Sequence, residues 1–187
     1  MKSLLKRSYS AIALVFLLLS ISINLFGQTT ISILPVNTGS VESSPVLSPK
    51  QWQHISEQIQ DHFVIQLSGK GTITKLSREH ILLLLKEMPD PDLDNLNTEA
   101  YRVISKKESL QYLVKCSVES IQVSDKNVIS PIRVIILDGS NGKVFWEKTL
   151  KVNKTLTSNT ITGQLLLNEI FKPSVNELSV QIRKLNF

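Results

Sequence analysis

The residues of this 187-residue chain that could do chemistry are few, and their spacing does not match a metal centre. His54, Glu57, Asp61 and His62 lie close together in sequence, as metal ligands often do. A two-histidine zinc motif, however, sets its histidines four residues apart with a glutamate between them. His54 and His62 are eight residues apart, which is about two turns of a helix. We therefore interpret these four residues as the polar face of an amphipathic helix.

His80 and Cys116 are the remaining candidates for a general base and a nucleophile. His80 stands beside a run of leucines, and no serine or cysteine pattern of an activated nucleophile accompanies it. Cys116 is the only cysteine and lies in an alternating apolar run, so we predict a small buried side chain. Neither a histidine nor a helix terminus is placed to stabilise its thiolate. The sequence predicts no catalytic residues and a protein that is not an enzyme.

Three further motifs resemble binding sites only in part. Asp90, Asp92 and Asp94 alternate as in a calcium loop, but the glycine at position six and the closing glutamate are missing. Residues 69–72 contain Gly-Lys and Thr, but they follow a predicted helix and precede a strand, the reverse of a phosphate-binding loop. Residues 153–155 form a glycosylation sequon that we interpret as chance. We therefore expect an acidic turn at 90–97, no metal and no cofactor.

The first 27 residues are typical of an export signal. Lys2, Lys6 and Arg7 precede an apolar run from Ala11 to Phe26, and Gly27 supplies a small residue for cleavage. The run is shorter than the roughly 20 apolar residues that span a bilayer, and polar residues interrupt it. We predict a cleaved signal peptide at 1–27 and a periplasmic or secreted protein, with an uncleaved anchor as the alternative.

The mature chain offers no signal for a lipid anchor or for nucleic acid. A bacterial lipoprotein needs a cysteine at the cleavage point, and none precedes Cys116. Without residues 1–27 the 21 basic residues fall to 18 against 16 acidic ones, which lowers the net charge from +5 to +2. Lysines and arginines are also not interleaved with aromatic residues, as a groove for nucleic acid requires. We expect a protein partner, no nucleic acid and no direct lipid anchor.

The apolar pattern predicts one α/β domain over residues 28–187, with about five strands in a central mixed or antiparallel sheet and helices packed on it. Ser48, Pro49 and Gln51 form a capping box that opens the first helix. An Asn-Gly pair at 141–142 predicts a hairpin, and Pro173 should kink or divide the last helix. The element order is β-α-β-α-α-β-β-β-α, with elements near 31–36, 49–68, 72–76, 78–88, 98–107, 111–123, 129–138, 143–152 and 160–185.

Side-chain orientation follows from the same periodicity. In the second helix Ile81, Leu82, Leu84 and Leu85 are expected to be buried. In the strand at 143–152, alternation places Val144, Trp146, Leu150 and Val152 on one face, and Phe145 on the solvent face opposite Trp146. A free edge of the sheet and this exposed phenylalanine are the two features that could form a partner surface.

The chain resembles the CsgG-like superfamily of curli assembly and transport proteins. The strand-then-helix run at 74–87, with Arg78 followed by spaced leucines and Glu87, is similar to a segment of that family. The run at 112–118, the hairpin at 132–144 and the opening strand at 33–36 also match its elements. The TolB amino-terminal domain and the lipoprotein activators of penicillin-binding proteins are related in architecture. The resemblance implies a protein-binding envelope domain without catalytic residues or a cofactor.

Three departures from the family limit what the resemblance implies. The acylated amino-terminal cysteine of the secretion pore is missing, and Cys116 stands where the family usually has glycine. The pore-forming members also extend their sheet into membrane-spanning hairpins, whereas only residues 124–127 and 139–142 join the strands here. We therefore interpret the chain as the domain without the pore. An adaptor or assembly factor, a subunit of an oligomeric complex and a periplasmic ligand-binding or hydrolytic protein all remain open.

Overall fold

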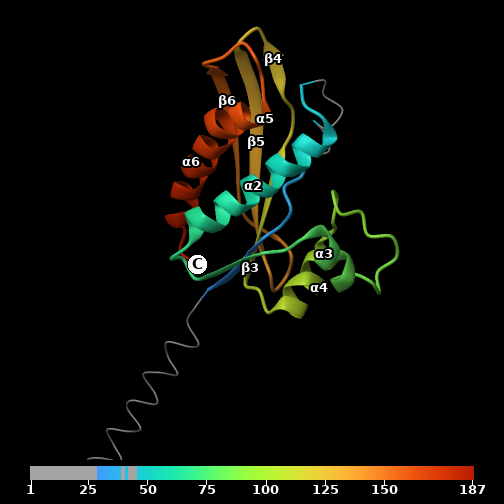
Figure 1. Ribbon diagram of the computed structural model, residues 1–187. Helices are drawn as coiled ribbons and strands as arrows, with labels where there is room; N and C mark the ends of the chain where they lie inside the picture. Colours follow the sequence, from blue (N-terminus) through green and yellow to red (C-terminus); the bar gives the residue numbers. More distant parts are fainter. Residues whose placement is uncertain (1–28, 39–40, 42–45) are drawn as a thin grey trace, which may run out of the picture.

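The computed structural model describes residues 29–38, 41 and 46–187, and the predicted signal peptide with its cleavage near Gly27 lies outside these residues. The described chain forms a mixed α/β domain, which confirms the predicted fold class (Figure 1). Its elements are β1 (Thr30–Ile33), α2 (Pro49–Leu67), β2 (Thr72–Lys75), α3 (Arg78–Leu84), α4 (Thr98–Glu108), β3 (Tyr112–Val118), β4 (Gln122–Ser124), β5 (Asn127–Asp138), β6 (Val144–Thr155), α5 (Gly163–Leu166), the π-helical turn η1 (Leu167–Phe171) and α6 (Lys172–Arg183).

The sheet is parallel on one side and antiparallel on the other. β1 pairs in parallel with β2 and with β3, whereas β3 and β5 run antiparallel. β6 pairs with β5 from Asn127 to Leu137 and occupies one side of that strand, so β3 and β4 share its other side. Among the described strands, β2, β4 and β6 each pair with one neighbour only.

The sheet has six strands instead of about five because the strand predicted at 111–123 is interrupted. β3 ends at Val118, and pairing with β5 resumes only at Gln122. In the gap Glu119 N donates to Pro131 O, and Ser130 Oγ donates to Ser120 O. Proline has no N–H to continue a ladder, so the partner strand leaves the regular pairing at this point.

Helices cover both faces of the sheet. On one face α2, α5, η1 and α6 pack against alternate residues of β1, β3 and β5. On the other face α3 and α4 form a smaller core that includes Leu34, Leu113 and Leu137. Figure 1 shows α2 and α6 lying across the long strands, with α3 and α4 grouped at one end of the sheet. Successive residues of a strand point to opposite faces, so one strand can contribute to both cores. In β3, Leu113 belongs to the smaller core and Val114 to the larger one.

The predicted start of α2 is confirmed. The Ser48 backbone N–H donates to Gln51 Oε1 at 2.8 Å, and Ser48 Oγ accepts from the Gln51 backbone N–H. Both hydrogen bonds of a capping box are therefore present, with Pro49 at the first helical position. Trp52, Ile55, Ile59, Phe63 and Leu67 are buried at the predicted spacing.

The helix predicted at 78–88 is shorter than expected, and one of its predicted core residues is exposed. α3 ends at Leu84, and it buries Ile81 and Leu84, with Leu85 just after it. Leu82 is 46% exposed, contrary to the prediction, and Leu83 is 62% exposed. Each helical residue turns about 100°, so a helix resting on one surface cannot bury five consecutive apolar side chains.

Pro173 lies in the first turn of α6, after a π-helical turn that separates this helix from α5. The π-helical turn η1 precedes it, and helical dihedral angles continue into α6. A proline ring clashes with the carbonyl four residues before it, which here is Glu169 O. That carbonyl instead accepts a hydrogen bond from Lys154 Nζ of β6 at 3.1 Å. The wider turn and this lysine together satisfy the backbone group that proline displaces.

A bulge near the start of β6 corrects the predicted burial of Val144. Leu137 pairs with Val144, but Ile136 pairs with Trp146, so Phe145 is an extra residue. Val144 is 55% exposed instead of buried. Phe145 is 43% exposed, as predicted, and it contacts Tyr112 and Phe187, with ring centroids 5.2 and 5.9 Å away.

Candidate functional site

A groove lies where β1 and β2 end. These parallel strands stop at Ile33 and Lys75, and the chain then enters α2 on one face of the sheet and α3 on the other. Carboxyl ends of parallel strands whose connections go to opposite faces form a crevice in many α/β proteins. The cavity here has a volume of about 610 Å³ and is lined by residues of α2, β2 and α3, together with Pro35, Val36 and Glu108.

Gln60 holds this groove together from within α2. Its side chain is buried, and its Nε2 donates to Ile33 O at 2.8 Å and to Leu76 O at 2.9 Å. Both acceptors lie at or just after the end of a strand, so one amide ties α2 to β1 and β2. Sequence reasoning missed this residue, although Gln60 precedes Phe63 by three and Leu67 by seven positions. That spacing places it on the apolar side of the helix.

Three basic side chains around the groove each lie close to a carboxylate. Lys75 Nζ lies 2.5 Å from Asp61 Oδ1, and His80 Nε2 lies 2.8 Å from Glu108 Oε1. Arg78 Nη2 donates to Asp94 Oδ1 at 2.8 Å. Exposed pairs of this kind contribute about 0–1 kcal/mol each. Their structural effect is to fix the positions of α2, α3 and the loop before α4 around the groove.

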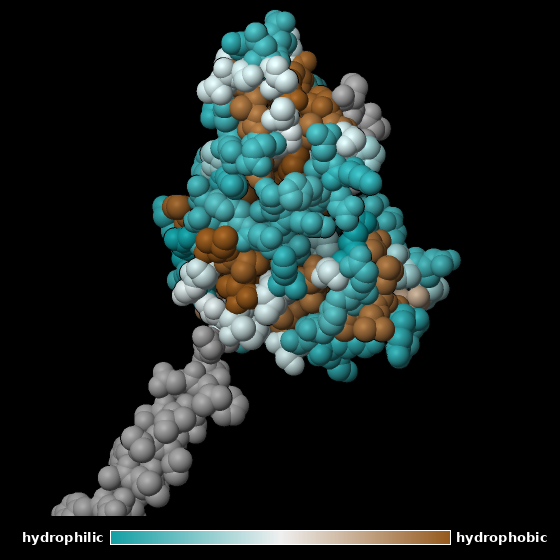
Figure 2. All heavy atoms as spheres, viewed as in Figure 1, coloured by the Kyte–Doolittle hydropathy of each residue, from teal (hydrophilic) through white to brown (hydrophobic). Residues whose placement is uncertain are grey.

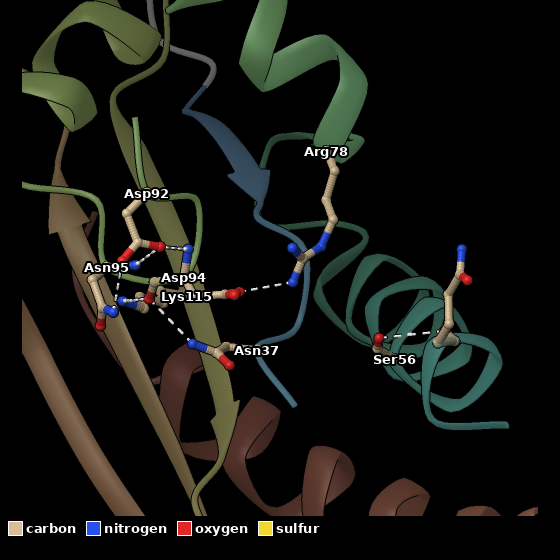
Figure 3. A network of polar contacts seen from close by, with 8 residues as sticks. Asn37, Ser56, Arg78, Asp92, Asp94, Asn95 and Lys115 are labelled. Atoms are coloured by element: carbon tan, nitrogen blue, oxygen red, sulfur yellow. Dashed lines mark hydrogen bonds and ion pairs between the residues drawn. The ribbon is translucent and has the colours of Figure 1, made fainter. Parts of the chain in front are cut away.

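The backbone carbonyl of Asp94 is the centre of a polar network (Figure 3). Its carbonyl accepts from Asn37 Nδ2 at 3.1 Å and from Lys115 Nζ at 3.4 Å. Lys115 Nζ also lies 3.3 Å from the Tyr101 hydroxyl. The loop at 90–97 is thereby attached to β3, to α4 and, through Arg78, to α3.

The predicted acidic turn at 90–97 is stabilised by its own backbone. Asp92 Oδ1 accepts from the Asp94 and Asn95 backbone N–H groups, and Asn95 Nδ2 donates to Asp92 Oδ2 (Figure 3). These hydrogen bonds, led by that of the Asn95 side chain, lower the pKa of Asp92. Within residues 29–38, 41 and 46–187, no three His, Cys, Asp or Glu side chains are grouped to hold a metal ion.

The four polar residues of α2 point to different neighbours. The His54 ring lies 2.7 Å from Gln58 Nε2, whereas His62 Nε2 lies 2.8 Å from Asn176 Oδ1 of α6. Asp61 pairs with Lys75, and Glu57 accepts from Gln53 Nε2. Of the four, Glu57 alone lines the groove. The interpretation as a polar helix face agrees with this arrangement.

The turn at 69–72 connects α2 to β2 and has a structural role. Gly69 and Gly71 adopt positive φ angles of 94° and 149°. Lys70 Nζ donates to Leu185 O at 3.2 Å and lies 5.9 Å from the centroid of the Phe187 ring. This lysine therefore fastens the chain beyond α6 to the turn, which joins Phe187 to the aromatic cluster of Tyr112 and Phe145.

Cys116 is fully buried on β3, as predicted, and burial raises the pKa of its thiol to about 12. We expect it to remain protonated and shielded at pH 8, so a disulfide reagent should modify the folded chain at least about 10³-fold more slowly than the denatured chain. The measurement is the rate at which the disulfide reagent reacts with Cys116, with and without denaturant. Stoichiometric labelling of the folded chain within the time needed for the denatured one would contradict this.

Two exposed leucines lie on α3, the helix whose first residues line the groove. Leu82 and Leu83 follow His80, which lines the groove, by two and three residues. Figure 2 shows apolar surface over the α3 region, at the lower right of the molecule, bordered by hydrophilic side chains. No helix within the described part of the chain is both long and apolar enough to cross a bilayer.

Comparison with known proteins shows a shared fold and no family. No family model and no curated protein matches the chain, so the CsgG-like resemblance is not confirmed. The hypothetical protein CT253 of Chlamydia trachomatis has a TM-score of 0.51 at 10% identity, over 82% of this chain and 96% of that one. The PelC dodecamer of Paraburkholderia phytofirmans scores 0.47 at 9% identity, over 83% and 84%. The LpoB C-terminal domain of Escherichia coli scores 0.43 at 13% identity, over 68% and 84%. Of these three similarities, the one to CT253 exceeds 0.5 and supports a common fold.

Proposed function

We propose that this chain is an adaptor or assembly factor of the bacterial cell envelope, exported by a cleaved signal peptide and acting by binding another protein. Kinship with CsgG-like proteins is part of the proposal and rests on the sequence motifs. The basic and apolar pattern of residues 1–27 supports export. The carrying observation is the exposure of Leu82 and Leu83 on α3, the helix whose first residues line the groove at the ends of β1 and β2.

The geometry favours protein recognition over small-molecule chemistry. Arg78 and Lys75 are each paired with an acidic side chain from another segment, and His80 lies 2.8 Å from Glu108, so these contacts hold the walls of the groove. The adjacent exposed leucines of α3 form apolar surface that a partner protein can remove from water. A periplasmic ligand-binding or hydrolytic role remains the second candidate, and the volume of the groove is the observation that favours it.

Replacing Leu83 with glutamate tests the recognition surface. The matched control is Ile65→Glu on α2, because Leu83 and Ile65 are 62% and 63% exposed. We expect both variants to fold, since a surface change usually alters stability by less than about 0.5 kcal/mol. Photo-crosslinking in intact cells, followed by quantification of each crosslinked partner, should show that Leu83→Glu loses a partner that Ile65→Glu retains. Identical crosslinks in wild type and both variants would exclude the α3 surface.

Export is tested separately by the amino terminus of the chain isolated from cells. We expect a mature protein that begins near Gln28 in the envelope fraction. Intact chain confined to the cytoplasm would contradict the proposed location.

A further inference from the structure

The free edge of β6 is the longest unpaired stretch of strand in the described sheet. β6 pairs with β5 alone among the described strands, and its bulge lies at Phe145, which leaves residues 146–155 in regular pairing. Leu156 N donates to Lys126 O in the same register. Because antiparallel residues alternate in the direction of their backbone groups, the N–H and C=O of Glu147, Thr149, Lys151 and Asn153 face the free edge. An edge without a proline or bulge along this length can accept a further strand.

The side chains of β6 point alternately to the two faces of the sheet. Trp146, Leu150 and Val152 pack partly against the core beneath the helices. By alternation, Glu147, Thr149 and Lys151 lie on the other face of the sheet. Arg133 of β5 donates to Glu147 Oε1 at 2.7 Å, and among the described residues no hydrogen bond is seen to Oε2 of this carboxylate. The Lys151 side chain is exposed and likewise makes no hydrogen bond or ion pair within the described chain.

We propose that β6 pairs antiparallel with β6 of a second copy of this chain, about a two-fold axis at Thr149, so that one sheet continues through both copies. In this register Glu147 of each copy lies opposite Lys151 of the other. On the helix-covered face, Trp146 lies opposite Val152. Opposite charges and aromatic–β-branched pairs are both stabilising when they face each other across antiparallel strands. A two-fold axis repeats every contact, as an isologous dimer requires.

Charge selects this register over its neighbours. An axis at Lys148 or at Lys151 would place that lysine directly opposite the same lysine of the second copy. An axis at Glu147 would place the two Glu147 side chains opposite each other. An axis at Leu150 would leave Glu147 opposite Asn153, with no pair of opposite charges. Like charges directly opposite are destabilising, so the axis at Thr149 is favoured among these five. The inference goes beyond the proposed function, because β6 and α3 are separate surfaces and either can operate alone.

Disulfide crosslinking tests the register directly. The only native thiol, Cys116, is buried, so it does not compete. In a Thr149→Cys variant the two introduced thiols face each other across the axis, and mild oxidation should give a covalent dimer. In a Lys151→Cys control they are displaced by four residues, roughly 13 Å, and should not crosslink. Absence of a crosslink at position 149, or equal crosslinking at both positions, would overturn the proposal.

A second pair of variants tests the backbone pairing in the full chain. Thr149→Pro removes an N–H that faces the free edge and no bond of the β5–β6 ladder, whereas Thr149→Val keeps that N–H. Light scattering over a concentration series should show the dimer for wild type and Thr149→Val and its loss for Thr149→Pro, with unchanged circular dichroism. Glu147→Lys should also abolish the dimer, and the double reversal with Lys151→Glu should restore it.

Two outcomes of these measurements would reject self-pairing. The first is a wild-type chain that remains monomeric at every concentration. The second is protection of β6 amides from hydrogen exchange only after an acidic strand peptide is added, which would assign the edge to a different chain.

Discussion

Truncating Phe171 to alanine is expected to lower the free energy of unfolding by about 3–5 kcal/mol. Its ring is fully buried in η1 and meets Trp52 edge-to-face, with centroids 6.2 Å apart. The substitution leaves a cavity between α2 and the sheet and also removes the aromatic pair, which is worth about 0.5–1.5 kcal/mol beyond burial alone. Urea denaturation followed by circular dichroism measures the change.

Phe145→Ala is the matched control for this substitution. Phe145 is the same residue type but is 43% exposed in the cluster with Tyr112 and Phe187. We expect a loss of about 1 kcal/mol, because only part of its surface is removed from water on folding. If the two substitutions had equal effects, η1 would not be anchored in the core as described.

Replacing Gly139 with alanine is expected to destabilise the fold by about 3 kcal/mol, at the upper end of the usual cost of overpacking. A Cβ at Gly139 would lie 2.2 Å from Leu110 O and 3.0 Å from Gln111 O, both of which are backbone atoms. Gly139 N also donates to Gln111 O at 2.7 Å, so the end of β5 cannot move away from β3 without losing this bond. The thermal midpoint should fall by roughly 6–12 °C.

Gly163→Ala provides the comparison. A Cβ added at Gly163 would lie 3.4 Å from its nearest neighbour, Ile55 Cδ1, which is an ordinary contact with the end of a side chain. Gly163 is the first residue of α5, where alanine favours the helix, so the midpoint should stay the same or rise slightly. An equal decrease for both glycines would show that β5 and β3 do not approach as closely as the structure places them.

Several features of the site could be predicted from local sequence. The capping box at Ser48, the burial of Cys116 and the acidic turn around Asp92 depend on residues near in sequence or on simple alternation. The burial of Gln60 could also have been predicted, because its spacing from Phe63 and Leu67 assigns it to the apolar side of α2. Its two acceptors, Ile33 O and Leu76 O, could not be predicted, since they depend on β1 and β2 lying side by side.

Long-range contacts decided the remaining features. The sequence could not show that Lys154 Nζ donates to Glu169 O, the carbonyl that Pro173 displaces from the helix. These residues meet only when β6 lies beside the last helix. It could not place the bulge that turns Phe145 toward Tyr112, because alternation along one strand contains no information about the partner's register. It also assigned Leu82 to the core from its run of leucines, without knowing which side of α3 the sheet would contact.

By itself, the sequence determined the α/β class, the approximate order of the elements and the cap that begins α2, since these follow from periodicity and from side chains within one turn of each other. Tertiary structure alone decided the groove at the ends of β1 and β2, the exposure of the α3 leucines and the free edge of β6. Each of these is a relation between elements distant in sequence, and their relative positions are set by packing on both faces of the sheet.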